Sequence, residues 1–322
     1  MTTKIVVVGS CMTDLNCYSK RLPKCGETLT GDRFTIGFGG KGANQCIAAA
    51  RIGGQDVEAT LVARVGDDSF GTNYLANLKK NGIDTRFVKS TPHLHTGVAQ
   101  ISVSETGENT IIIVPGANTA LSPGDVRDAQ DRVVEADVAL FQFETPIPTT
   151  LEALRLRRAA GKGTSIVNAA PVIADFDADI YRLSDIFCVN ETEAELLTGV
   201  ALSEAPEGDG LVLAAGKAAE ALLQKGCHLV ILTLGKHGAV VLDPKECNKP
   251  QHIAAKPAKA VDTTGAGDAF LGALAYFLGA RKDLNLLEQV RRAMHYATLS
   301  VEKPGTQDSF PCRENLSSDL LK

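Results

Sequence analysis

Short runs of apolar and β-branched residues alternate along most of the chain with stretches of helical periodicity. The apolar runs predict buried strands at Ile5–Val8, Ala59–Val65, Asp137–Phe143, Ser165–Asn168, Asp185–Val189 and Leu229–Leu234. The periodic stretches predict helices at Ala43–Ile52, Ser69–Asn81, Ser122–Glu135, Thr149–Ala160, Glu191–Thr198 and Leu211–Lys225. Because strands that alternate with helices usually form parallel sheets covered on both faces, the pattern predicts a three-layer α/β/α fold with a mainly parallel sheet.

Two strand-like stretches, Leu29–Phe38 and Thr96–Val114, interrupt this rhythm with alternating polar and apolar residues. Within the second, Glu105–Asn109 is typical of a hairpin turn. We interpret these stretches as a small β-sheet lid formed by residues 14–38 and 96–114, with residues 1–13, 39–95 and 115–322 forming the core. A sheet that projects from the strand ends of the core would cover a ligand bound in the crevice there.

Composition narrows the class of partner. The chain has 322 residues, 44% of them hydrophobic, and a net charge of −5. It therefore lacks the basic excess that favours nucleic acid or anionic membranes, and we expect a small-molecule ligand. The eight cysteines show no C-x-x-C pair or zinc spacing, and no apolar run approaches the roughly 18 residues of a membrane span. The run Ile5–Val8 is also too short for a signal peptide, so we expect a cytoplasmic protein, and a nuclear location stays open.

The segment Asp262-Thr263-Thr264-Gly265-Ala266-Gly267-Asp268 precedes a helix-like stretch, Ala269–Leu278. Small residues ahead of a helix leave its first N–H groups uncovered, and these groups together with the helix dipole attract an anion such as phosphate. Asp268 then lies where a base that removes a hydroxyl proton during phosphoryl transfer is needed. The alternative is a glycine turn in which Asp268 only complements the positive end of the helix dipole.

A second glycine-rich segment, Gly37–Gly42, satisfies the pattern G-x-G-x-x-G. It lies too far after the first predicted strand for a dinucleotide-binding loop, which argues against a nicotinamide-dependent dehydrogenase. It is not a Walker A loop either, because Gly42 and not Ser or Thr follows Lys41. Two interpretations remain: a loop whose Lys41 and Asn44 contact a polyhydroxyl ligand, or a tight turn with Lys41 in solvent.

Together, the segments Gly39–Gln45 and Asp262–Asp268 resemble the two signatures of the ribokinase-like carbohydrate kinases. Further matching segments are Gly9–Asp14, Phe143-Glu144, Asn190–Glu193 and Thr233–Gly238, so that the resemblance covers almost the whole chain. It implies the α/β/α core and β-sheet lid of that family. Within the family the chain is most similar to the ribose kinases. The resemblance therefore implies ATP-dependent phosphorylation of D-ribose at its 5-hydroxyl, by direct in-line transfer to give ribose 5-phosphate.

The resemblance also assigns roles to individual residues. Asp268 would be the base, and the backbone N–H groups of Gly265, Ala266 and Gly267 would form the anion hole. Besides Asp268, the implied sugar-binding positions are Met12, Thr13, Asp14, Gly40, Lys41, Gly42, Ala43, Asn44 and Glu144. Bacterial ribokinases have Asn where this chain has Met12, so one side-chain contact to the sugar is not carried over. A kinase for deoxyribose, fructose or adenosine is therefore an alternative, and a non-catalytic sugar- or nucleotide-binding protein is another.

ATP and two cations complete the implied site. The positions that match ATP-binding residues are Asn190, Thr233, Leu234, Gly235, Lys236, His237, Gly238, Gly267, Asp268 and Met294. Asn190 and Glu193 would support Mg²⁺ through water, although Asn with Glu three residues later is also the pattern of a helix capping box. The positions that match a K⁺ site, mostly through backbone carbonyls, are Asp262, Thr264, Ser300, Lys303, Gly305 and Ser309. We also expect a homodimer formed through the exposed face of the lid.

Overall fold

The computed structural model describes residues 2–322, and a nine-stranded sheet forms its centre. The strand order is β13-β12-β11-β10-β9-β8-β1-β4-β5. Seven neighbouring strands run parallel: β5 (Asp84–Thr91), β4 (Val57–Gly66), β1 (Thr3–Val8), β8 (Val138–Phe141), β9 (Thr164–Asn168), β10 (Ile186–Asn190) and β11 (Val230–Thr233). An antiparallel edge follows, made of β12 (Ala239–Leu242) and β13 (Gln251–Ile253). Met1, which the predicted core includes, lies outside the described residues.

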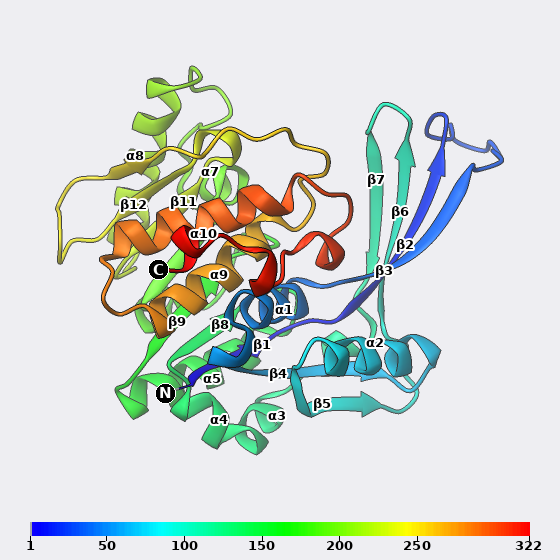
Figure 1. The fold of residues 1–322 in the computed structure, drawn as a ribbon, viewed down its shortest axis with the longest axis horizontal. Helices are drawn as coiled ribbons and strands as arrows, with labels where there is room; N and C mark the ends of the chain where they lie inside the picture. Colours follow the sequence, from blue (N-terminus) through cyan, green and yellow to red (C-terminus); the bar gives the residue numbers. More distant parts are fainter. Residues whose placement is uncertain (1) are drawn as a thin grey trace.

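Helices cover both faces of this sheet (Figure 1). On one face lie α1 (Lys41–Gly53), α2 (Ser69–Lys80), α9 (Ala266–Ala280), α10 (Leu286–Ser300) and the short α11 (Ser318–Leu321). On the other lie α3 (Pro123–Asp128), α4 (Gln130–Glu135), α5 (Ile147–Ala160), α6 (Asp179–Leu183), α7 (Glu191–Thr198) and α8 (Asp209–Gln224). Within β1, Ile5 and Val7 enter the first apolar core, whereas Val6 and Val8 enter the second. The predicted three-layer α/β/α fold is confirmed.

A second sheet of four strands projects from the core (Figure 1), and we call it the small sheet. Its strand order is β3-β2-β6-β7. The strands are β2 (Met12–Ser19), β3 (Arg33–Gly39), β6 (Gly97–Ser104) and β7 (Asn109–Val114). The predicted hairpin is the antiparallel pair β6 and β7, and β2 joins it to β3. These strands fall in or directly beside the two segments assigned to the lid.

Some elements differ from the prediction. The single helix expected over Ser122–Glu135 is divided into α3 and α4 at Ala129, whose φ of −100° and ψ of 12° interrupt the helical conformation. The pattern also left out β2, β5, β12, β13 and the helices α6, α10 and α11. β5 is a largely polar strand at the edge of the sheet, and β12 and β13 span only four and three residues. A polar strand such as β5, or one of three residues such as β13, lacks the apolar run that indicates a buried strand. β12 is a buried apolar run, Ala239–Leu242, and could have been predicted from the sequence.

Candidate active site

A cavity of about 180 Å³ lies where the parallel strands β9, β10 and β11 end, beside the beginnings of α1, α7 and α9. It brings together many of the residues singled out from the sequence. Its polar and glycine lining includes Lys41, Asn168, Asn190, Glu193, Thr233, Thr263, Gly265, Gly267 and Asp268. The carboxyl ends of the strands are where α/β sheets usually bind ligands, so we take this cavity as the centre of the site.

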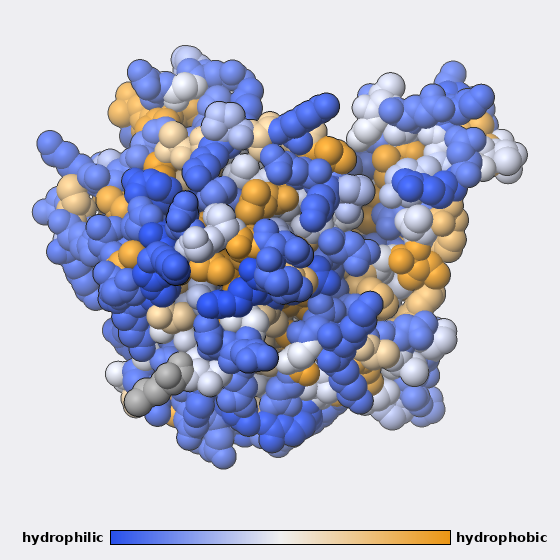
Figure 2. Space-filling model, viewed as in Figure 1, coloured by the Kyte–Doolittle hydropathy of each residue, from blue (hydrophilic) through white to orange (hydrophobic). Residues whose placement is uncertain are grey.

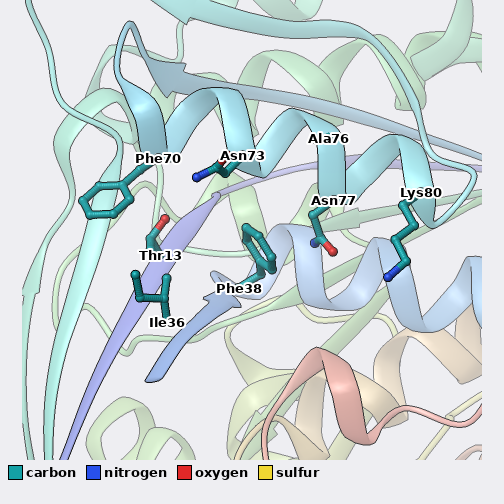
Figure 3. A pocket seen from close by; sticks show the side chains of 8 residues that line it. All are labelled: Thr13, Ile36, Phe38, Phe70, Asn73, Ala76, Asn77 and Lys80. Carbon is teal, nitrogen blue, oxygen red and sulfur yellow. The ribbon is translucent and has the colours of Figure 1, made fainter. Parts of the chain in front are cut away.

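A larger cavity of about 460 Å³ lies between the small sheet and α2 (Figure 3). Its wall consists of Thr13, Ile36 and Phe38 of the small sheet and Phe70, Asn73, Ala76, Asn77 and Lys80 of α2. Of these residues only Thr13 belongs to the predicted site, and no carboxylate lines the cavity. Size therefore does not identify the reactive centre, and the smaller cavity has the appropriate chemistry.

Asp268 is held from both sides at the start of α9. Its carboxylate Oδ2 accepts a hydrogen bond from Asn44 Nδ2 at 2.9 Å, and its Oδ1 accepts one from Gln45 Nε2 at 2.9 Å. The side chain is only 7% exposed. Two consecutive residues in the first turns of α1 thus fix the orientation of the carboxylate. It is placed to accept a proton from a ligand that enters the cavity.

The turn before α9 supplies uncovered N–H groups next to this carboxylate. Gly265 has a φ of 77°, and an added Cβ would lie 2.5 Å from Thr306 Cγ2, so glycine is required there. The Ala266 N–H donates to Thr263 O at 3.2 Å. In the described part of the chain, the N–H groups of Gly265 and Gly267 have no protein acceptor. Of the three donors assigned to the anion hole, two are therefore fully available to an anion.

Several residues of this network were missed from the sequence. Gln45 also contacts Asn168 Oδ1 at 3.2 Å, and it accepts a hydrogen bond from Gln142 Nε2 at 2.6 Å. Asn168 ends β9, and Gln142 directly follows β8. The signal that could have found them is position, since polar residues at the carboxyl ends of neighbouring parallel strands meet at one edge of a sheet.

Glu144, Lys41 and Asp14 form a second group beside the small sheet. Glu144 Oε2 accepts hydrogen bonds from Ser10 Oγ at 2.5 Å and from the backbone N–H of Lys41 at 2.8 Å. Ser10, which was not predicted, also accepts from the Gly42 N–H at 3.3 Å. These contacts join the loop after β1, the loop after β8 and the start of α1. Met12 and Thr13, the first residues of β2, are buried, with 3% and 1% exposure.

The charges of this group perturb one another. Burial, with the nearby carboxylates of Glu144 and Asp268, raises the pKa of Asp14 to about 7. Burial also raises the pKa of Glu144, against the opposing effect of the Lys41 charge. Burial alone would lower the pKa of Lys41, but the charges of Asp268, Glu144 and Glu193 outweigh it and the net shift is upward. One ammonium group therefore faces an excess of buried carboxylates, which suits hydroxyl groups as ligands.

We expect Asp14→Asn to stabilise the ligand-free protein at pH 8. The folded pKa of Asp14, about 7, lies above its usual 3.8, so the folded state binds this proton more tightly than the unfolded chain. The resulting stabilisation is complete below the unfolded pKa and is lost as the pH rises through 7. Asn cannot ionise. The melting temperature of Asp14→Asn should therefore exceed that of the wild type at pH 8, and the difference should vanish near pH 4.

Asp283→Asn is the matched control, because the hydrogen bond from Arg281 lowers the pKa of Asp283 to about 2. That substitution should not stabilise the protein at pH 8. An equal change in melting temperature for Asp14→Asn at both pH values would contradict the assigned pKa.

On the other side of the cavity, Asn190 and Glu193 form the capping box of α7. Asn190 Oδ1 accepts from the Glu193 N–H, and Glu193 Oε2 accepts from the Asn190 N–H, both at 2.9 Å. Both residues also line the cavity. Burial raises the pKa of Glu193, although the hydrogen bond that it accepts from the Asn190 N–H acts in the opposite direction. The structural interpretation of this motif is therefore confirmed, and it leaves the two side chains beside the site.

The donor set suits a largely hydrated Mg²⁺. Within residues 2–322, no group of three or more His, Cys, Asp or Glu side chains is arranged to hold a metal ion. Mg²⁺ typically keeps several waters and takes only one or two protein carboxylates together with phosphate oxygens. Glu193 and Asn190 therefore fit support through water better than a closed protein cage.

Most of the other residues assigned to ATP do not line this cavity. Thr233 lines it, whereas the following turn, η3 (Gly235–His237), and Gly238 do not. Gly238 has a φ of 95°, and an added Cβ would lie 2.0 Å from Ile253 O, so the turn packs closely against the end of β13. Lys236 is exposed and pairs with Glu207 at 3.2 Å. Met294 is buried in α10, with 8% exposure.

The structure brings together the two segments assigned to K⁺. The backbone N–H of Val261 donates to Val301 O at 2.7 Å. Asp262 accepts from the Thr264 N–H through Oδ1 and from the Gly305 N–H through Oδ2, both at 2.9 Å. Burial opposes ionisation of Asp262, but these hydrogen bonds outweigh it and lower its pKa. The Asp262 carboxylate thus links the 262–264 segment to the 300–305 segment ahead of α9.

Known proteins resemble this chain along nearly its whole length. The model of the pfkB family of carbohydrate kinases matches residues 2–313. The mouse protein named ribokinase is 48% identical, with 98% of this chain and 94% of the mouse protein covered. A deoxyribokinase of Salmonella typhi is 35% identical, with 98% of each chain covered. The structure of Arabidopsis thaliana ribokinase complexed with ribose and ATP is 30% identical and superposes with a TM-score of 0.86, covering 100% of this chain and 99% of the plant protein.

Proposed function

Because this chain belongs to the pfkB family of carbohydrate kinases, we propose that it transfers the γ-phosphoryl group of ATP to the 5-hydroxyl of D-ribose. The chain is an ATP-dependent sugar kinase, and the relatives named ribokinase support ribose as the sugar. One observation carries the chemical proposal. The Asp268 carboxylate, fixed by Asn44 and Gln45, lies beside the uncovered N–H groups of Gly265 and Gly267.

In the proposed reaction, Asp268 takes the proton of the sugar hydroxyl as that oxygen attacks the γ-phosphorus. The bond to the β-phosphate oxygen breaks on the opposite side, so ADP leaves and no phosphoenzyme forms. The N–H groups of Gly265 and Gly267 and the dipole of α9 stabilise the negative charge on the transferring group. The proton passes from Asp268 to solvent after the products leave. Lys41 adds a positive charge to the same cavity.

The sugar would lie between the small sheet and the start of α1. Asp14 and Glu144 accept hydrogen bonds from hydroxyl groups, and Asn44 donates its remaining N–H. Met12 supplies no polar atom where bacterial ribokinases have Asn, so contacts to one hydroxyl depend on other groups. The 35% identity to a deoxyribokinase makes 2-deoxyribose the first competing substrate.

We propose that two cations assist. Mg²⁺, held through water by Asn190 and Glu193, would neutralise charge on the ATP phosphates. K⁺, held by Asp262, Thr264, Ser300, Lys303, Gly305 and Ser309, would lie behind the glycine turn that carries the anion hole. The hydrogen bonds that join the 262–264 and 300–305 segments support this assignment.

The proposed function is tested by measuring ADP release from Mg-ATP with ribose, 2-deoxyribose, fructose or adenosine, in K⁺ or Na⁺. We expect turnover with ribose, which is faster in K⁺. A higher kcat/KM for another substrate would change the proposed sugar. If no sugar or nucleoside stimulates ADP release while ribose still raises the melting temperature, the protein binds ribose without phosphorylating it.

We also propose a homodimer through one face of the small sheet. One row of paired residues crosses the sheet: Ile36 of β3 pairs with Leu15 of β2, Leu15 with Gln100 of β6, and Gln100 with Ile112 of β7. Side chains in such a row share one face, and Asp14, one residue along β2, points to the other face. Ile36 and Ile112 are 55% and 64% exposed, and Figure 2 shows hydrophobic residues along the projecting sheet. An apolar face of this kind is typical of a protein interface.

Sedimentation equilibrium tests the dimer. The protein should sediment at twice its chain mass, and Ile112→Lys should shift it to monomer because a charge is introduced into the apolar contact. Leu213→Lys, at another exposed apolar position in α8, should leave the dimer intact. A monomeric wild-type protein would overturn this proposal.

A cytoplasmic location also stays a proposal. All eight cysteines are free thiols, four of them buried, which supports a reducing compartment. Among residues 2–322, no helix has both the length and the apolar character needed to cross a membrane.

A further inference from the structure

Gln307 is a buried residue to which neither the sequence motifs nor the proposed function assigns a role. It begins η4 (Gln307–Ser309), between two proposed K⁺ ligands, Gly305 and Ser309, and is 4% exposed. Its Nε2 donates to Asn44 Oδ1 at 2.9 Å and to Tyr74 OH at 3.1 Å. Its Oε1 accepts from Asn77 Nδ2 at 2.9 Å. Both N–H groups and the carbonyl of this amide are therefore engaged in contacts inside the protein.

These contacts form a chain with one direction, which starts at Asp268. Both oxygens of Asp268 accept hydrogen bonds, one from Asn44 and one from Gln45. Asn44 therefore turns its NH₂ group to Asp268 and its Oδ1 to Gln307. Gln307 must then present its own NH₂ group to Asn44 and its Oε1 to Asn77. Rotation of either amide by half a turn would place oxygen against oxygen. The geometry of Asp268 is thus tied to the side chain of Gln307.

The second N–H of Gln307 connects this chain to the base of the small sheet. Tyr74, which is completely buried, donates its hydroxyl proton to Gly39 O. Gly39 is the last residue of β3, and Gly40 follows it directly before α1. Asn77 of α2, which donates to Gln307 Oε1, lies in the wall of the larger cavity between α2 and the small sheet (Figure 3). Gln307 therefore contacts α1 and α2 directly and reaches the end of β3 through Tyr74.

The backbone of Gln307 is fixed as well. Its carbonyl accepts from the guanidinium of Arg51 in α1, and Arg51 Nε donates to Asn81 Oδ1 at 2.9 Å. The loop that contains the proposed K⁺ ligands thus has a set position relative to α1. A displacement of this loop would carry the Gln307 amide with it.

We propose that Gln307 is a positioning residue for phosphoryl transfer, which orients Asn44 and through it the Asp268 carboxylate. This inference rests on the proposed function, because it assigns Asp268 as the base. Gln307 itself does not touch the sugar or the phosphate. Its role is to keep one N–H of Asn44 on Asp268 and the other free for the sugar.

The test compares Gln307→Met, which keeps the side-chain length and removes the donors, with the wild type. We expect kcat/KM for ribose to fall by roughly 10- to 100-fold, while KM for ATP changes less than about twofold. In a protein that already carries Asn44→Ala, Gln307→Met should lower kcat/KM for ribose little further, because the amide that Gln307 orients is already absent.

Gln289→Met is the matched control. Gln289 is 5% exposed and also donates twice through Nε2, but to the backbone carbonyls of Phe277 and Arg281. It should lower the melting temperature about as much as Gln307→Met and leave kcat/KM for ribose near the wild-type value. Equal losses of kcat/KM in the two variants, or full additivity with Asn44→Ala, would overturn the proposal.

A second readout separates this inference from the proposed function. A wild type without sugar-dependent turnover would refute the function. The side-chain NH₂ signals of Asn44 in ¹⁵N NMR need no substrate, and they should shift and exchange faster in Gln307→Met. Unchanged Asn44 signals would refute the positioning role whether or not the wild type turns over ribose.

Discussion

Asp268→Asn should lower kcat for ribose phosphorylation by roughly 10²- to 10⁴-fold, the contribution expected of a general base. The amide cannot take the hydroxyl proton. It also presents an NH₂ group to one of two donors, Asn44 Nδ2 or Gln45 Nε2, that now contact a carboxylate. A coupled assay of ADP release at saturating ribose and Mg-ATP would measure the loss.

Asp128→Asn is the control for this prediction. Asp128 pairs with Lys89 at 2.5 Å, and its side chain is 62% exposed. Its substitution should leave kcat unchanged. If Asp268→Asn kept more than about a tenth of the wild-type kcat, Asp268 would not be the base.

The second large effect is expected from Gly42→Ala. The added Cβ would lie 2.4 Å from Ser10 N and 2.6 Å from Gly9 Cα, where the first turn of α1 contacts the backbone after β1. No flexible side chain can move aside there, so the helix must shift. We expect a loss of about 3 kcal/mol or more in the free energy of unfolding. The Glu144 contacts to Ser10 and Lys41 should be disturbed too, so kcat/KM for ribose should fall. Urea unfolding and steady-state kinetics would measure the two effects.

Gly124→Ala gives the comparison for this substitution. Gly124 lies in α3, and an added Cβ would come no closer than 3.4 Å to Ser122 Oγ. That variant should be as stable as the wild type or more so, because Ala favours helix more than Gly does. Equal free energies of unfolding for the two alanine variants would contradict the prediction, because α1 could then move away from β1 without loss of stability.

The alternation of apolar runs and helical stretches was sufficient to predict the layers. β1 was predicted from its continuous apolar run, which arises because Ile5–Val8 is buried on both faces of the sheet, with alternate residues in the two cores. α10 was left out although its buried residues, Leu286, Val290 and Ala293, follow helical spacing. β2 could not be found in this way, since its pairing with β3 and β6, rather than an apolar run, makes it a strand.

The site was predicted in parts, and the links between the parts were not. Local patterns indicate Asp268 at the start of a helix and Asn44 in a glycine-rich loop. The hydrogen bond between them joins residues that are 224 positions apart, and it depends on how α1 packs against α9. Gln307 is harder still to predict, because it lies in a loop without a periodic pattern and acts only through its neighbours in space. Asn190 and Glu193 show the opposite case: the capping box and the place beside the cavity occur together, so those two interpretations never excluded each other.

The most direct test of the central claim is to identify the product of wild-type protein, ribose and Mg-ATP by ³¹P and ¹³C NMR. The account predicts one ribose 5-phosphate for each ADP, with phosphorus coupled to C5 and no inorganic phosphate. Phosphate on another carbon would contradict the assigned hydroxyl. Release of inorganic phosphate without a sugar phosphate would contradict transfer to ribose altogether.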